Sequence, residues 1–172
     1  MNFKRILRNT PWSGDVKSFK KYIVKEFNKG RGKRTIDDVL CDPVSAKAFC
    51  EAVRESLGSS DFFDGLILAA LLNVRKNPSL KTQSDAKKKR PATLQAKLKQ
   101  CGLSVADQKD LGAKITGSLR EIFKGYTIDN ILCYPDEALA LCRDIKADDP
   151  YKGVSDELIL RKLLSIRKAG KL

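Results

Sequence analysis

The sequence of 172 residues contains no histidine, one methionine and one tryptophan. Histidine is the usual residue for acid–base catalysis and metal binding, so without it acid–base chemistry would need carboxylates or lysines. Six aspartates lie at predicted helix starts, where helix capping accounts for them: Asp37, Asp38, Asp42, Asp64, Asp136 and Asp156. We therefore predict no enzymatic activity, no metal site and no cofactor.

Long apolar runs are also absent from the sequence. The longest, Gly65–Val74, has the length of a core helix, whereas a helix that crosses a bilayer needs about 20 apolar residues. The first twelve residues include basic side chains but no apolar stretch long enough for a signal peptide. The sequence therefore predicts a cytoplasmic protein without membrane association.

The five cysteines give no sign of a disulfide framework or a zinc site. They are Cys41, Cys50, Cys101, Cys133 and Cys142. An odd count without an export signal favours reduced thiols. Two pairs are each nine residues apart, which is wider than the spacing of cysteine pairs in zinc sites. Because buried cysteine behaves as a small apolar residue, we predict that these pairs belong to the core.

Nine residues of the sequence occur twice in nearly the same form, as TIDDVLCDP at 35–43 and TIDNILCYP at 127–135. With a shift of 92 positions, residues 35–76 align with 127–168 without a gap and are identical at 17 of 42 positions. Most other apolar positions exchange one apolar residue for another, such as Val39 for Ile131. A fixed period of this size indicates a duplicated structural unit.

Each repeat has the pattern of helices and no convincing alternation of strands. Phe19, Ile23 and Phe27 are spaced by four residues and so share one helical face. Thr35 and Asp42 are predicted helix caps. The helix after Asp42 is predicted to end near Gly58, or near Pro150 in the second repeat, and a last helix begins near Asp64 or Asp156. We predict an all-α protein with two tandem homologous modules of about four helices each. The expected domains are 1–80, a basic linker and connecting segment at 81–106, and 107–172.

The last helix of the first repeat is apolar on nearly every side from Leu66 to Leu72. Such a helix is buried, which excludes it as the exposed recognition helix of a helix-turn-helix motif. The second repeat has Arg161 and Lys162 where the first has Ala69 and Ala70. The first repeat's helix therefore needs a cover, which the other module, a partner protein or self-association would supply.

Positive charge is abundant and unevenly placed. The net charge is +13, and residues 17–34 hold eight basic residues and one acidic residue. Residues 75–100 hold nine basic residues and one acidic residue. On the first helix Lys17, Lys21 and Lys25 lie opposite the apolar face, but the second repeat has Lys109, Ala113 and Gly117 at these positions. The apolar face is common to both repeats, and the row of lysines belongs to the first.

This charge distribution predicts a largely sequence-independent nucleic-acid-binding protein that contacts phosphates through lysine and arginine. Such a protein can act as a subunit of a larger nucleoprotein complex. The predicted contact residues are Lys17, Lys21, Lys25, Lys29, Arg31, Lys33, Arg34, Lys87, Lys88, Lys89 and Arg90. The alternatives are an adaptor that docks an acidic partner protein and a basic surface that only contacts solvent. The sequence does not distinguish DNA from RNA, or single strands from duplexes.

Overall fold

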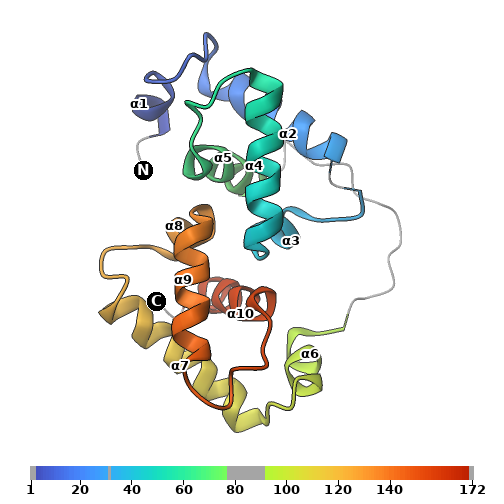
Figure 1. Ribbon diagram of the computed structural model, residues 1–172, viewed down its shortest axis with the longest axis vertical. Coiled ribbons are helices and arrows are strands. Elements are labelled where there is room, and N and C mark those ends of the chain that lie inside the picture. Colours follow the sequence, from blue (N-terminus) through green and yellow to red (C-terminus); the bar gives the residue numbers. More distant parts are fainter. Residues whose placement is uncertain (1–2, 31, 77–91, 171–172) are drawn as a thin grey trace.

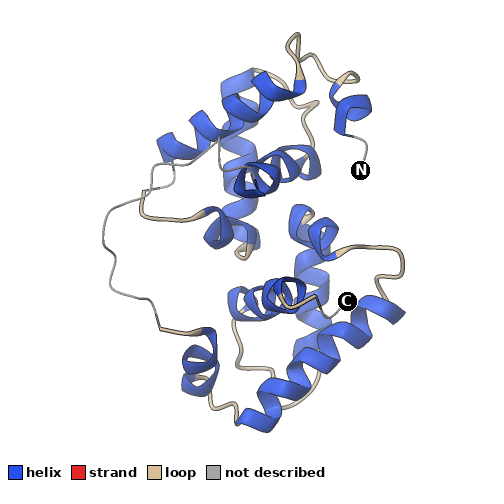
Figure 2. Ribbon diagram, turned by 180° about the vertical axis from the view of Figure 1, so that it is seen from behind, coloured by secondary structure: helices blue, strands red, loops and turns tan. Residues whose placement is uncertain are grey.

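A computed structural model describes residues 3–30, 32–76 and 92–170. Within these ranges the chain is all-helical and has no strand, as the sequence predicts (Figure 2). The helices form two bodies that are stacked along the longest axis of the molecule (Figure 1). The first body contains α1 (Phe3–Leu7), α2 (Val16–Gly30), α3 (Ile36–Leu40), α4 (Pro43–Leu57) and α5 (Asp64–Lys76). The second contains α6 (Leu94–Gln100), α7 (Val105–Glu121), α8 (Ile128–Cys133), α9 (Pro135–Lys146) and α10 (Asp156–Lys168).

The caps that the sequence predicts are present at the helix ends. Thr35 accepts a hydrogen bond from the backbone N–H of Asp38, whose carboxylate accepts one from the backbone N–H of Thr35. Asp42 caps α4, whose first residue is proline. Gly58 ends α4 in the left-handed conformation at φ 65°, which glycine adopts without steric cost.

Two details differ from the sequence prediction. Helix α9 ends at Lys146, before the predicted end near Pro150. Asp148 and Asp149 follow the capping residue Ala147, and negative charge is unfavourable at a helix C-terminus. The short helices α1 and α6 are not among the predicted elements, and α6 lies within the segment 81–106 that the sequence assigns to a linker.

Each body has its own apolar core. In the first, Phe19, Ile23 and Phe27 of α2 are fully buried, which confirms the predicted apolar face. In the second, Leu111, Ile115 and Leu119 of α7 face the corresponding cluster. Three pairs of helices begin 92 positions apart, because α3, α4 and α5 start at residues 36, 43 and 64, and α8, α9 and α10 start at 128, 135 and 156.

Helix α5 is buried nearly all round, as predicted. Leu66, Ile67 and Leu71 are inaccessible to solvent. Helix α2 covers one side of α5, and α8 of the second body covers another. The ring of Tyr134 lies so close to Gly65 that a Cβ atom there would be 2.6 Å from it. The second body therefore covers α5. The sequence leaves open whether the other module, a partner protein or self-association supplies this cover, and the structure contains the first of these.

Each repeated segment contributes one cysteine to the apolar cluster of the other body. Cys41 of the first body belongs to the apolar cluster of the second, and Cys133 of the second belongs to the cluster of the first. Three ion pairs also join the bodies: Asp38 with Arg161, Asp37 with Lys168 at 3.2 Å, and Lys47 with Asp136 at 2.6 Å. None of the described helices is long and apolar enough to cross a membrane.

Candidate nucleic-acid interface

Helix α2 separates its apolar and basic side chains onto opposite sides. Its buried side carries aromatic and aliphatic residues, and its outer side carries Lys17, Lys21, Lys25 and Lys29, which are all exposed. One helical turn advances about 5.4 Å, so residues spaced by four form a row along the helix. We call these four lysines the α2 lysine row. The fold thus brings together four of the residues that the sequence predicts as phosphate contacts.

The other predicted contact residues are divided between described and undescribed parts of the chain. Lys33 and Arg34 are exposed in the loop that follows α2. The guanidinium of Arg34 donates a hydrogen bond to Ser45 Oγ at 2.6 Å, which holds it near the start of α4. The remaining predicted residues, Arg31, Lys87, Lys88, Lys89 and Arg90, lie outside the described residues.

One member of the lysine row has a partner within its own helix. The ammonium of Lys29 lies 2.7 Å from Glu26 Oε1, and this hydrogen bond raises the pKa of Lys29. The positive charge of Lys29 is therefore partly neutralised. Lys17, Lys21 and Lys25 form no ion pair within the described residues, so their charge faces solvent.

Helix α1 and the residue after it add three exposed cations to the first body that are not among the predicted contacts. Helix α1 packs against α2, and it carries Lys4 and Arg5, with Arg8 immediately after its end. The ammonium of Lys20 lies 5.4 Å from the ring centre of Phe3, within the range of a cation–π contact. Helix α1 has only five residues and lacks a capping pattern like that of Thr35 and Asp38 at α3, so it was not predicted and these cations were missed.

The aromatic side chains near the lysine row pack against each other. The ring centre of Trp12 lies 5.2 Å from that of Phe19 and 5.5 Å from that of Tyr22. The Tyr22 hydroxyl is 2.8 Å from Ser56 Oγ. These contacts give Trp12 and Tyr22 a structural role. The lysine side chains are therefore the main groups on this face for binding an anion.

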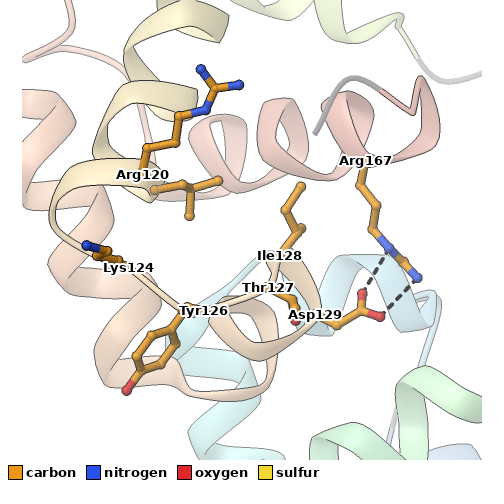
Figure 3. Close-up of a pocket in the computed structure, with 9 residues that line it drawn as sticks. Arg120, Lys124, Tyr126, Thr127, Ile128, Asp129 and Arg167 are labelled. Atoms are coloured by element: carbon orange, nitrogen blue, oxygen red, sulfur yellow. Dashed lines mark hydrogen bonds and ion pairs between the residues drawn. The ribbon is translucent and has the colours of Figure 1, made fainter.

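A second cationic site lies in the second body, where the end of α7, the following loop and the end of α10 enclose a pocket of about 510 Å³ (Figure 3). Leu119 and Ile128 line it, and Arg120, Lys124 and Arg167 contribute positive charge. These residues are not among the contacts predicted from the sequence. The available signal was the repeat alignment, which places Asn28 on Arg120 and Gly32 on Lys124.

The predicted core position of four cysteines is confirmed. Cys41, Cys50, Cys133 and Cys142 are buried, and Cys101 is exposed. Burial raises the pKa of Cys41 to about 12 and that of Cys142 to about 12, so both thiols are neutral at pH 7. Among the described residues no cluster of cysteine and carboxylate side chains has the arrangement of a metal site.

No protein-family model matches the chain, and neither a curated protein nor a solved structure matches it.

Proposed function

We propose that the chain consists of two tandem copies of one helical module joined by a basic segment, and that the first copy binds nucleic acid. The duplication is supported by the gap-free alignment at a shift of 92 residues and by three pairs of helices that begin 92 positions apart. Each copy provides an apolar cluster, and each repeated segment contributes one cysteine to the cluster of the other copy.

The observation that carries the nucleic-acid proposal is the difference between α2 and α7. Both helices bury an equivalent apolar face. Only α2 carries lysines at three successive positions on its outer side, because α7 has Ala113 and Gly117 at the last two. Packing does not require lysine at exposed positions, so packing does not explain the row on α2. Binding to phosphates, driven by release of counterions, accounts for it.

Binding of this kind is largely independent of base sequence. Lysine is a flexible point charge that contacts phosphates without reading base edges. The one long apolar helix that follows a turn, α5, is buried and cannot enter a groove. The protein would therefore bind many sequences with similar affinity, as a coating or assembly subunit does.

Fluorescence anisotropy with labelled single-stranded and duplex DNA and RNA, at several salt concentrations, tests the proposal. The key variant replaces Lys17, Lys21 and Lys25 with glutamine. It should bind all sequences more weakly, and the log–log salt slope for a duplex should fall by up to ~0.9 for each phosphate that the variant no longer neutralises. A matched control replaces Lys99, Lys109 and Arg143, three exposed cations of the second body, and so removes the same charge.

An equal decrease of affinity in both triple variants would mean that net charge, and not the α2 lysine row, determines binding. Unchanged affinity in the α2 variant would mean that the row only contacts solvent. If the wild-type protein binds no nucleic acid at low salt but binds a defined acidic protein, such as a polyglutamate-tailed test protein, the adaptor function replaces this proposal.

A further inference from the structure

The pocket at the end of α7 combines an apolar floor with a cationic rim. Leu119 and Ile128 are each less than a tenth exposed and supply the floor. In Figure 3 Arg120 extends from α7 on one side of Ile128, and Arg167 extends from α10 on the other. A cavity of about 510 Å³ lies within the range of about 300–1,000 Å³ that small-molecule sites occupy.

The repeat alignment explains why the second body has space at this position. It places Phe27 of the first body on Leu119 and Phe49 on Leu141. Phe27 and Phe49 have ring centres 6.0 Å apart and pack edge to face, so two aromatic rings fill this region of the first body. Leucine is smaller than phenylalanine and has no ring. At Leu119, which lines the pocket, the second body therefore has a smaller side chain than the first body has at Phe27.

The same alignment shows that two of the three cations at the rim of the pocket have no basic counterpart in the first body, whereas Arg167 stands at the position of Arg75. Arg120 stands at the position of Asn28, and Lys124 stands at the position of Gly32. Both cationic side chains are exposed, and neither forms an ion pair within the described part of the chain. The space and the charge therefore occur together in the second body, in a region where the first body has phenylalanine, asparagine and glycine.

A third cation is held in a fixed orientation. Arg167 donates a hydrogen bond from Nη2 to Asp129 Oδ2 at 3.1 Å, and its Nε lies 2.9 Å from Asp129 Oδ1 in the same ion pair (Figure 3). Arginine has five N–H donors, so donors remain for another acceptor. Because Asp129 cancels the charge of Arg167, the net charge of the pocket comes from Arg120 and Lys124.

We propose that this pocket binds a nucleotide, with its phosphate on Arg120 and Lys124 and its base against Leu119 and Ile128. The planar guanidinium forms two parallel hydrogen bonds with phosphate oxygens, and a neutral base covers an apolar floor that a simple phosphate or sugar phosphate would leave exposed. The nucleotide is either free or the phosphorylated end of a single strand. Only the second source rests on the proposed nucleic-acid binding.

Isothermal titration calorimetry of the full chain with adenosine monophosphate, ribose 5-phosphate and inorganic phosphate tests the site. We expect adenosine monophosphate to bind more tightly than either of the other two. Replacing Arg120 and Lys124 with glutamine should weaken its binding roughly tenfold or more, because the variant cannot form charge-assisted hydrogen bonds with the phosphate. Replacing Lys109 and Arg143, exposed cations outside the pocket, is the matched control and should leave binding unchanged.

A second variant fills the pocket without changing its charge. Leu119→Phe introduces the residue of the first body, and it should weaken binding of adenosine monophosphate by roughly tenfold while inorganic phosphate binding stays the same. Circular dichroism and a thermal melt establish that this variant is folded. If it is not, the exposed Arg120→Gln, Lys124→Gln variant decides the question alone.

Single strands with and without a 5′-phosphate, used as competitors, separate the two sources of the nucleotide. Competition by the phosphorylated strand alone assigns the site to strand ends, and competition by neither assigns it to the free nucleotide. Equal affinity for all three small ligands, or no binding of adenosine monophosphate at millimolar concentration, overturns the proposal. The variant lacking Lys17, Lys21 and Lys25 should bind adenosine monophosphate normally, so failure of this site and failure of the α2 proposal are observed separately.

Discussion

The two bodies use the same pattern of buried residues and differ in what they expose. Each of the three buried residues of α2 has a buried apolar counterpart on α7, as Phe19 has Leu111 and Ile23 has Ile115. On the outside, α2 carries a row of lysines, while the end of α7 carries a cationic pocket. At these core positions both bodies keep apolar side chains, although phenylalanine and leucine differ in volume. Exposed positions need not be apolar, and this is where the chemistry of the two bodies differs.

The ion pairs between the two bodies also differ from the residues at the equivalent positions of the repeat. Asp38 pairs with Arg161, but the residues at the equivalent positions are Asn130 and Ala69. Lys47 pairs with Asp136, and the equivalent residues are Leu139 and Val44. These two ion pairs therefore have residues of the required charge on only one side of the repeat, whereas the third pair, Asp37 with Lys168, has Asp129 and Lys76 at the equivalent positions. Two first bodies, or two second bodies, could not form the first two pairs, so these charges favour the contact between unlike bodies.

The largest expected effect on stability comes from giving each body the residue of the other at the equivalent positions Ala70 and Lys162. Ala70 is fully buried in α5, whereas Lys162 at the equivalent position of α10 is partly exposed. Ala70→Lys places an unpaired charge in the core and should lower the free energy of unfolding by about 3–5 kcal/mol. The reverse change, Lys162→Ala, should alter it by less than about 1 kcal/mol. Urea denaturation followed by circular dichroism measures both; similar values would contradict the assigned difference in burial.

A smaller effect is expected at the ion pair between Asp38 and Arg161, whose side chains are 33% and 25% exposed. Arg161→Ala introduces the residue of the first body, and Asp38→Asn introduces that of the second while it preserves the helix cap. Each change should cost about 1 kcal/mol, a value reduced by solvent screening. The double variant should cost less than the sum of the single ones in urea denaturation. Additive costs would mean that the pair does not couple the bodies.

The pH dependence of stability provides a further test of Asp38. Burial raises its pKa, but hydrogen bonds from the backbone and side chain of Thr35 and from Arg161 lower it more, so the pKa lies below its ordinary value of 3.8. A lowered pKa in the folded state gives stability that is present above about pH 4 and is lost as the pH falls further. The difference in melting temperature between wild type and Asp38→Asn should therefore be constant from about pH 7 to pH 5 and shrink below about pH 4. A difference that persists at low pH would assign the effect to the cap.

The smallest effect is expected at Lys47 and Asp136, whose side chains are 41% and 82% exposed. Exposed ion pairs contribute little because water and salt screen them. Lys47→Leu, which introduces the residue of the second body, should leave the urea midpoint unchanged within error. A clear decrease in stability that disappears at high salt would show that this pair has a larger part in holding the bodies together than its exposure indicates.

The local structure of this protein follows from the sequence. Capping by Thr35 and Asp42, the end of α4 at Gly58 and the buried face of α2 each depend on residues within about four positions of one another, and all were predicted. The short helices α1 and α6 were missed because five to seven residues contain too little periodicity and, unlike α3, they lack a paired capping pattern such as that of Thr35 and Asp38. The exposed row of lysines could be predicted because it is the reverse side of a predicted apolar face.

The contact between the bodies was decided by the tertiary structure alone. The sequence shows that α5 needs a cover, but it does not show that α8 provides it or that Asp38 meets Arg161, 123 residues away. The pocket also depends on position, since Leu119, Ile128 and Arg167 come from separate helices. Capping and periodicity act between near neighbours in the chain and are therefore visible in the sequence. Contacts between distant residues depend on how whole helices pack, and no pattern within one helix encodes that.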